Sequence, residues 1–273
     1  MDTSSGDTGK SGQADKEEGS FFAFLLKLVL VVAIFRSFIF SPFNIPSESM
    51  MPRLLEGDYL LAAKWPYGYS KYSLPFSVPL IPGRIMKSQP ERGDVVIFKA
   101  PPLKTQDYVK RVIGLPGDQI QVLDGIVHIN GEAVSHEQIA DLLFTPPPEK
   151  DCVAPQFAEI GDAGRLQCRY PQFRETLPNG VSYTVLDMGT TPQDTTDVVV
   201  VPRGHMFVMG DNRDNSMDSR FPAIPGKGVG IVPQDNLVAR ATIIMWSTDG
   251  TAEWLKPWTW FTAARWNRIG DII

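Results

Sequence analysis

Two short segments, far apart in the chain, hold the residues whose types and spacing could do chemistry. Ser49 lies within residues 45–52 (IPSESMMP), and Lys110 lies within residues 108–118 (YVKRVIGLPGD). A serine hydroxyl needs a base before it can act as a nucleophile, and a lysine can be that base only where its surroundings hold it neutral. The pair therefore predicts serine hydrolase chemistry that uses no histidine.

Both residues also have an ordinary structural interpretation. A serine shortly after Pro46 is commonly a turn residue or a helix cap, and Lys110 could lie on an edge strand in water. Ser47 favours the functional interpretation, because its hydroxyl and the Ser49 backbone N–H could form an oxyanion hole. If Arg111 faces solvent, alternation along the strand turns Lys110 towards the interior, where an unpaired ammonium is costly.

A third polar segment, residues 210–220 (GDNRDNSMDSR), follows an apolar run that predicts a strand. It could be a solvated loop, or it could supply the donors and acceptors that orient a lysine. A calcium loop of the EF-hand type would need a terminal glutamate that the segment lacks. No spacing of His, Cys and Asp resembles a zinc ligand set, so no metal and no cofactor are expected.

A Ser-His-Asp triad is the alternative mechanism, and it requires one of the chain's three histidines. His128 falls in a predicted hairpin strand and His136 in an irregular stretch. His205 stands next to the polar segment and is the serious contender, although a structural role is the favoured interpretation.

The apolar run 21–40 must position Ser49 relative to a membrane. Its length predicts a transmembrane helix over residues 21–41, preceded by a disordered tail over residues 1–20, which the family resemblance described below would place in the cytoplasm. A cleaved export signal and a buried core helix are the alternatives, but no small-residue cleavage site follows the run. Because Ser49 lies nine residues beyond Phe40, at ~3.5 Å per residue it must stay near the bilayer.

The remaining sequence predicts a mostly β fold. Short apolar or alternating runs, separated by Gly and Pro, indicate a β catalytic body over residues 42–131 and 198–273, and a loop-rich inserted subdomain over residues 132–197. The predicted strands cover residues 59–63, 94–98, 109–113, 119–123, 126–129, 198–201, 205–209 and 237–246.

The two cysteines, Cys152 and Cys168, both fall in the insertion. Their spacing fits a disulfide in an oxidising compartment, and two free thiols are the alternative. The net charge of -5 and the lack of a basic stripe argue against nucleic acid as a partner. Near the C-terminus, aromatic residues beside cations suit a bilayer interface: Trp254, Trp258, Trp260 and Trp266.

Four motifs in the same order make the chain resemble the bacterial type I signal peptidases, or leader peptidases. The resemblance covers the apolar run and most of the chain after it. Its motifs are residues 46–52 with Gly57-Asp58, residues 92–96 (RGDVV), residues 108–118, and residues 210–220.

The resemblance implies a role for each matching residue. Ser49 would be the nucleophile, Lys110 the general base, and Ser47 an oxyanion donor. Ser216 would hydrogen-bond and orient the lysine. The supporting residues would be Asp218 and Arg220, an ion pair, together with Asp211.

The resemblance also implies the setting of the reaction. A single-pass enzyme of the cytoplasmic (inner) membrane would hold a signal-peptidase-like β body on the outer, periplasmic side. It would cut signal peptides from exported precursors after small residues at the first and third positions before the cut. Its partners would be those precursors and the phospholipid bilayer, with proximity to the export translocon left open.

Two residues depart from the family pattern, and two other functions remain open. Glu48 stands where glycine is frequent, so its carboxylate is expected to point away from the oxyanion site, and Arg53 stands where threonine is common. One alternative is a membrane-tethered β-rich binding or assembly module, which predicts an exposed Lys110 distant from Ser49. The other is a relative that processes one dedicated substrate.

Overall fold

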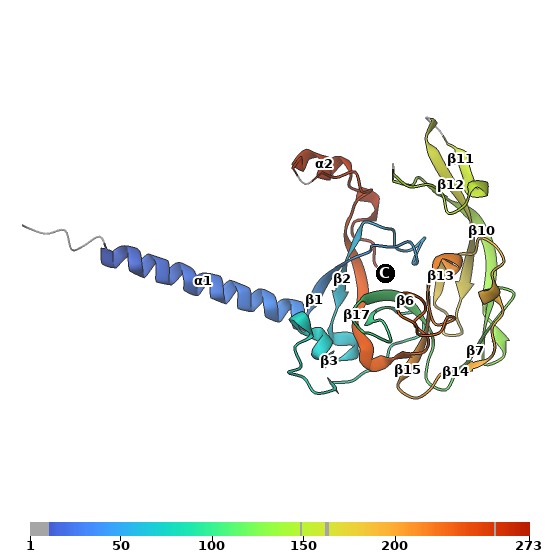
Figure 1. Ribbon diagram of the computed structural model, residues 1–273, viewed down its shortest axis with the longest axis horizontal. Helices are drawn as coiled ribbons and strands as arrows, with labels where there is room; N and C mark the ends of the chain where they lie inside the picture. The colour runs from blue at the N-terminus through green and yellow to red at the C-terminus, as the bar shows by residue number, and fades with distance from the viewer. Residues whose placement is uncertain (1–10, 148, 162–163, 254) are drawn as a thin grey trace, which may run out of the picture.

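The apolar run forms most of a long helix, α1 (Ser11–Phe38). The structure is a computed structural model that describes residues 11–147, 149–161, 164–253 and 255–273. Figure 1 shows α1 leaving the β body as a rod, and only 6% of its apolar segment Ser20–Phe38 is buried. These 19 residues, at ~1.5 Å each, are long enough to cross most of the ~30 Å hydrocarbon core of a bilayer.

Both predicted ends of the helix differ from the structure. The prediction of a disordered tail is wrong for residues 11–20, which continue α1, while residues 1–10 lie outside the described residues. Gln, Ala, Lys and Glu in this stretch are good helix formers, and the apolar segment already supplies the helix nucleus. At the other end, α1 stops at Phe38, before the predicted 41, because Pro42 disfavours helix in the residue before it.

The C-terminal end of α1 is fastened to the β body by hydrogen bonds and ring contacts. The Ser41 hydroxyl donates to the Arg36 carbonyl at 2.5 Å, and the Tyr69 hydroxyl donates to the Phe38 carbonyl at 3.0 Å. The rings of Phe38 and Tyr69 also meet edge to face at 5.2 Å. These contacts satisfy carbonyls that have no partner within the helix and fix where the body begins.

The largest sheet is antiparallel and places Lys110 near its centre. Its strand order is β1-β2-β17-β5-β6-β15-β16, and in it Lys110 pairs with Val96 while Arg111 pairs with Met209. The mostly β fold that the sequence predicts is confirmed. The strands are β1 (Phe40–Asn44), β2 (Asp58–Ala63), β17 (Leu237–Ser247), β5 (Val95–Lys99), β6 (Asp107–Gly114), β15 (His205–Met209) and β16 (Val232–Pro233).

The smaller sheets complete the body and form the insertion. A sheet of order β14-β7-β8-β9 contains the predicted hairpin, whose turn residues Asp124 and Gly125 have φ angles of 49° and 81°. In the insertion, β10 and β11 flank β12, and β13 also pairs with β12. The strands are β7 (Gln119–Leu123), β8 (Ile126–Ile129), β9 (Glu132–Ala133), β14 (Val199–Val200), β10 (Ser135–Phe144), β11 (Ala158–Ile160), β12 (Leu166–Thr176) and β13 (Ser182–Leu186), with β3 (Tyr69–Ser70) and β4 (Arg84–Ile85) paired separately and a short helix α2 (Pro257–Thr262) near the C-terminus.

The insertion holds more regular strand than its weak periodicity predicts, and it shares a core with the body. Leu177 and Val185 of the insertion are buried in one cluster with Ile113 and Phe207 of the largest sheet. A second cluster joins Cys168 to Met51, two residues after Ser49. The division into a body over residues 42–131 and 198–273 and an insertion over residues 132–197 remains our proposal.

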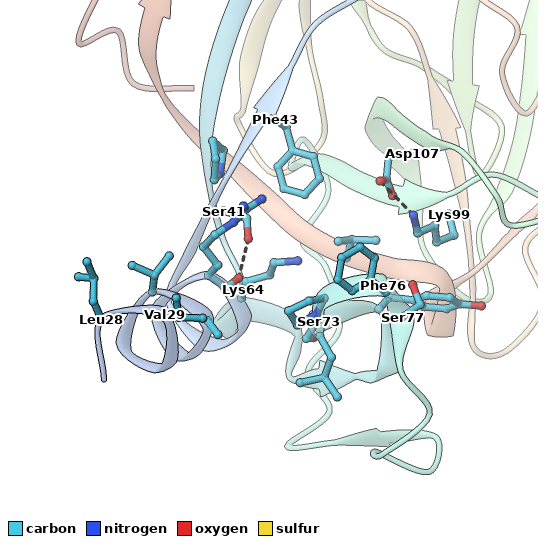
Figure 2. Close-up of a pocket in the computed structure, with 18 residues that line it drawn as sticks. Leu28, Val29, Ser41, Phe43, Lys64, Ser73, Phe76, Ser77, Lys99 and Asp107 are labelled. Carbon is cyan, nitrogen blue, oxygen red and sulfur yellow. Dashed lines mark hydrogen bonds and ion pairs between the residues drawn. The ribbon is translucent and has the colours of Figure 1, made fainter. Parts of the chain in front are cut away.

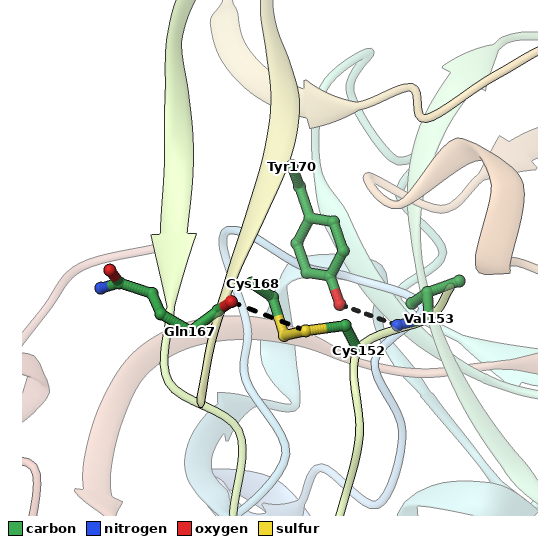
Figure 3. The surroundings of a disulfide bond; sticks show 5 residues. All are labelled: Cys152, Val153, Gln167, Cys168 and Tyr170. Carbon is green, nitrogen blue, oxygen red and sulfur yellow. Dashed lines mark hydrogen bonds between the residues drawn. A yellow bond between two sulfur atoms is a disulfide. The ribbon is translucent and has the colours of Figure 1, made fainter. Parts of the chain in front are cut away.

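The predicted disulfide between Cys152 and Cys168 is confirmed. It links β12 to the segment before β11, with the two Cα atoms 5.6 Å apart (Figure 3). Beside it, the Val153 backbone N–H donates to the Tyr170 hydroxyl at 3.0 Å. Because Cys168 and Tyr170 both pack in the cluster that holds Met51, the disulfide braces the surface on which the Ser49 turn rests.

Removing the disulfide should destabilise the protein without removing any group of the site. A bridge between residues 16 apart contributes about 3 kcal/mol in the chain-entropy model. We expect the Cys152→Ser/Cys168→Ser variant to lose about that much unfolding free energy in denaturant titrations. Wild-type protein in reducing agent is the matched control, and an unchanged midpoint in both samples would show that the bridge contributes no stability.

Candidate active site

Ser49 lies on a turn between β1 and β2 whose following residues are anchored in the core. Met50, Met51 and Leu54 are all buried, so the turn cannot shift without breaking apolar contacts. The backbone N–H of Asn212 donates to the Ser49 carbonyl at 3.1 Å. The polar segment predicted to orient the site therefore contacts the serine turn through the backbone.

Lys110 reaches Ser49 from the middle of β6. Its side chain is buried, with the residue 3% exposed, and its Nζ donates to the Ser49 Oγ at 2.6 Å and to the Val109 carbonyl at 3.1 Å. This separation is short enough for direct proton transfer between the two groups. The two segments singled out in the sequence are thus brought together, and the exposed, distant lysine that a binding module predicts is not seen.

The surroundings of Lys110 favour its neutral form. Burial lowers the pKa of Lys110 from its ordinary 10.5 to about 8, although the carboxylates of Asp218 and Asp211 act to raise it. Each carboxylate is neutralised by its own arginine, so desolvation prevails. A lysine with this pKa has a substantial neutral fraction near pH 8, as a general base needs.

Ser47, the predicted oxyanion donor, has its hydroxyl close to that of Ser49. The two hydroxyl oxygens are 3.4 Å apart. The Glu48 carboxylate has Lys150 of the insertion at 3.7 Å and the Asn215 amide at 3.4 Å as its partners. These contacts hold the Glu48 charge in an ion pair, and the expectation that its carboxylate points away from the oxyanion position stays a prediction.

Ser216 lies at the site but does not make the expected bond. It is buried, and its Oγ has no hydrogen-bond partner within the described residues, so the hydrogen bond to Lys110 implied by the resemblance is not formed here. The lysine instead points to Ser49 and Val109. A Cβ on Gly210 would lie 2.3 Å from the Ser216 Oγ and 2.4 Å from the Ser49 carbonyl oxygen, so glycine is required there.

Asp218 and Arg220 form the predicted ion pair. The Arg220 Nε donates to Asp218 Oδ1 at 2.9 Å and its Nη2 to Oδ2 at 3.0 Å. The Gly210 backbone N–H also donates to Asp218, at 3.0 Å. Burial acts to raise the pKa of Asp218, but Arg220 and these hydrogen bonds outweigh it and lower the pKa. The pair therefore stays ionised and holds the polar segment against the Ser49 turn.

Asp211 pairs with Arg111, which corrects the expectation that Arg111 faces solvent. Arg111 is buried and donates to both Asp211 oxygens, at 2.7 Å and 2.6 Å. It also donates to the Gly93 carbonyl at 2.8 Å. Both faces of β6 are covered at this point, one by the Ser49 turn and the other by the polar segment. Lys110 and Arg111 point to opposite faces of the strand, and both side chains are buried.

Sequence reasoning missed a third buried ion pair, which lies behind the site. Glu175 of β12 forms a bidentate pair with Arg213 of the polar segment, and both are buried. Tyr183 donates to Glu175 at 2.8 Å, and His136 contacts it at 3.3 Å. Nothing in the insertion sequence singles out Glu175, because its partner lies 38 residues away and is chosen by the fold.

The histidines take no part at Ser49. The ring of His205 contacts the Arg203 carbonyl at 3.0 Å, and that of His128 contacts the Ile126 carbonyl at 3.1 Å. His136 belongs to the Glu175 network. The hydrogen-bond partners of the Ser49 Oγ among the described residues are Ser47 and Lys110, so the geometry favours the lysine as the base.

Two other motifs have structural roles. Asp58 is fully buried and accepts from the Leu55 backbone at 2.8 Å and from Arg268 at 2.6 Å, which closes the segment between Ser49 and β2. Arg92 pairs with Asp118 at 2.9 Å and so joins the second motif to the end of the third. These motifs position the strands that carry the site.

The Glu175 pair predicts a specific acid sensitivity. Burial acts to raise the pKa of Glu175, but the charge of Arg213 and the hydrogen bonds from His136, Arg213 and Tyr183 lower it from 4.5 to about 2. A lowered carboxyl pKa stabilises the fold fully above about pH 4.5, and that stabilisation is lost as the pH falls towards about 2. Glu175→Gln should remove this pH dependence and, by leaving Arg213 unpaired, cost about 3–5 kcal/mol at neutral pH.

Urea titrations at neutral pH and at about pH 3 measure both effects. The matched control is Glu137→Gln in the neighbouring strand, because Glu137 has an exposed pair with Arg174 at 3.8 Å. Such a pair contributes little, about 0–1 kcal/mol. Equal stability of the two variants would contradict a structural role for the Glu175 pair.

Comparisons with known proteins identify the family of this chain. A sequence model of the family described as "Signal peptidase, peptidase S26" matches residues 19–246. "Signal peptidase I" of Rickettsia prowazekii (strain Madrid E) is 38% identical over 247 residues, covering 87% of this chain and 83% of that protein. "Signal peptidase I" of Rickettsia conorii (strain ATCC VR-613 / Malish 7) is 37% identical over 276 residues, covering 93% and 91%.

Among solved structures, a signal peptidase I from Enterococcus faecalis V583 aligns at 26% identity and a TM-score of 0.30, covering 57% of this chain and 98% of that one. The resemblance drawn from the sequence motifs is confirmed by the family match and by the curated relatives. The chain belongs to the signal peptidase family, peptidase S26, and is a serine endopeptidase of the signal peptidase I type.

Proposed function

We propose that this chain cleaves N-terminal signal peptides from exported precursors with Ser49 as the nucleophile and Lys110 as the general base. The observation that carries the proposal is the 2.6 Å contact between the Lys110 Nζ and the Ser49 Oγ. The lysine is buried and its pKa is lowered to about 8, so the pair has both the geometry and the proton affinity that the reaction needs.

The reaction can be written from the positions of the two groups. Neutral Lys110 accepts the Ser49 proton as the Oγ attacks the scissile carbonyl, and the resulting lysinium then protonates the leaving amine. The developing oxyanion would be bound by the Ser47 hydroxyl and the Ser49 backbone N–H. In the second half, Lys110 activates the water that releases the acyl group. Asp218, Arg220 and Asp211 support the site, and Ser216 is proposed to bond the lysine when substrate is bound.

The substrate would lie in a cavity of about 600 Å³ beside the pair. Ser47, Ser49 and Lys110 line it together with the apolar side chains of Ile45, Met50, Val109 and Met217. Such a lining suits a peptide with small apolar side chains before the cut. We therefore propose that the preference for small residues at the first and third positions applies here.

We further propose that α1 crosses the cytoplasmic membrane once and holds the body on its outer, periplasmic side. The Cys152–Cys168 disulfide supports an oxidising location. Phe76 and Leu80 are exposed in the segment after β3, which lies beside the body end of α1 (Figure 1), and this supports contact with lipid. Near the C-terminus, Trp258 and Phe261 of α2 are exposed as well, while Trp254 lies outside the described residues. Proximity to the translocon would follow from acting on precursors as they emerge.

Ser49→Ala and Lys110→Met should each slow precursor cleavage at least about 10³-fold, because each removes one partner of a single proton-transfer unit. The double variant should be little slower than either single variant, because residues that act as one unit are not additive. Single-turnover cleavage of a precursor measures this. His205→Ala is the control and should keep full activity; loss in His205→Ala with full activity in Lys110→Met would instead favour a triad.

The activity of the wild-type enzyme should rise with pH through about 8 and level off above it, because a base must lose its proton and burial lowers the pKa of Lys110 to about 8. The pH dependence of kcat/KM on a signal-peptide substrate measures this. Lys64 is an instructive control, because burial lowers its pKa to about 8 as well. Lys64→Met must leave the limb in place, and a limb near the ordinary 10.5 would mean that another group is the base.

A further inference from the structure

A cavity of about 670 Å³ lies between the C-terminal half of α1 and the β body, separate from Ser49 and Lys110. Figure 2 shows its two kinds of wall: Leu28 and Val29 on the helix side, and Lys64, Phe43 and Ser73 on the body side. Arg36, in the last turn of α1, also lines it. The cavity is therefore apolar along the helix and cationic where the helix meets the body.

Lys64 is the unusual residue of this cavity. It follows β2 directly and is only 4% exposed, yet its ammonium forms no hydrogen bond or ion pair within the part of the chain that the structure describes. Its contact is with the ring of Phe43, whose centroid is 5.5 Å away. Burial lowers the pKa of Lys64 to about 8; Asp107 opposes this, while Lys99 and Arg36 lower it further. The Lys64 ammonium is not among the fully buried polar atoms without a partner, so it keeps accessible surface, and Lys64 lines the cavity, where an anion can reach it.

The charges around the cavity do not balance. Arg36, Lys64 and Lys99 face one carboxylate, Asp107. That carboxylate is already paired with Lys99, at 3.0 Å (Figure 2). Arg36 and Lys64 are left as two cations at the body end of an apolar helix, at the depth where the headgroups of a bilayer would lie.

We propose that this cavity binds one anionic phospholipid, with its phosphate between Lys64 and Arg36 and an acyl chain along Leu28, Val29 and Val32 of α1. The three apolar side chains are exposed and line the cavity from the headgroup level into the membrane span. An apolar peptide segment fits less well, because it would cover Lys64 without supplying a charge. The inference goes beyond the proposed function: it needs α1 to be a membrane anchor, but not Ser49 to be the nucleophile.

The lipid would lie directly beside the substrate cavity. Phe43 and Asp107 line both cavities, so one wall separates the two. A bound lipid would neutralise the cations behind that wall and fix the angle between α1 and the body. The site would thus hold the catalytic body at a defined position on the membrane surface.

The test uses the full chain, purified in a neutral detergent and stripped of lipid. Native mass spectrometry with dioleoyl phosphatidylglycerol should show one retained lipid per protein, and dioleoyl phosphatidylcholine should be retained at least about tenfold less. Lys64→Met combined with Arg36→Gln should weaken phosphatidylglycerol retention at least about tenfold, as expected for losing two charge-assisted bonds. The matched control is Lys71→Gln, because Lys71 is exposed, lies nearby in sequence and does not line the cavity.

Thermal unfolding separates loss of the site from loss of the fold. Lipid-free Lys64→Met should melt no lower than lipid-free wild type, because the substitution removes an unpaired buried ammonium. Phosphatidylglycerol should raise the Tm of wild type and of Lys71→Gln, but not that of Lys64→Met. Glycerol phosphate should not reproduce the shift, because it lacks the acyl chain.

Four results would overturn the proposal: equal retention of phosphatidylcholine, undiminished retention by the double variant, an equal Tm shift with glycerol phosphate, or displacement of the lipid by an apolar signal peptide. None of these readouts depends on cleavage, so a failure here is distinct from a failure of the Ser49 and Lys110 proposal.

Discussion

For Lys110 to act as the proposed base, it must be able to lose its proton although the carboxylates of Asp218 and Asp211 lie close to it. Asp218 and Asp211 both act to raise its pKa, and burial acts in the opposite direction. Burial prevails and lowers the pKa to about 8, and each carboxylate is paired with an arginine, Asp218 with Arg220 and Asp211 with Arg111. The polar segment can then be rigid and densely hydrogen-bonded without restoring the ordinary pKa of Lys110. Much of the remaining structure keeps these two ion pairs and the Ser49 turn in place.

The insertion supports the polar segment and the Ser49 turn through buried contacts. Glu175 pairs with Arg213 inside the polar segment, and the Leu186 backbone N–H of β13 donates to the Asp211 carbonyl at 2.9 Å. On its other side, the cluster around Cys168 supports Met51 beneath the Ser49 turn. The insertion therefore acts as a brace that is covalently closed by the disulfide and held to the site by buried charge. This explains why a segment without catalytic residues shares a core with the catalytic body.

The membrane helix and the reacting pair are linked by very little chain. The Ser41 and Tyr69 hydroxyls fasten the end of α1 to the body, and β1 leads directly to the Ser49 turn. With α1 across the membrane as proposed, a peptide bond at the depth of the lipid headgroups would reach Ser49 without leaving the membrane surface. The cationic cavity between α1 and the body lies along the same path. Anchoring, lipid contact and catalysis would then be organised around a single junction.

The sequence by itself determined the elements that have a strong local signal. Hydrophobic length identified the helix, alternation and turn residues identified β2, β5, β6, β7, β8, β15 and β17, and four ordered motifs identified the family. The sequence also singled out candidate residues that lie together in the structure: Ser47, Ser49, Lys110 and the Asp218–Arg220 pair. Local pattern is enough for these because side-chain period and motif spacing are written directly in the chain.

Only the tertiary structure decided which charges are buried and with which partners. Arg111 was expected in solvent, yet it is covered and paired with Asp211, 100 residues away. Glu175, the partner of Arg213, gave no sequence signal, and the Ser216 hydroxyl does not make the bond that the motif implies. Burial and pairing depend on what packs against each face of a strand, and that is set by contacts between distant segments. The sequence therefore named the candidate groups, while the fold determined the state in which they are held.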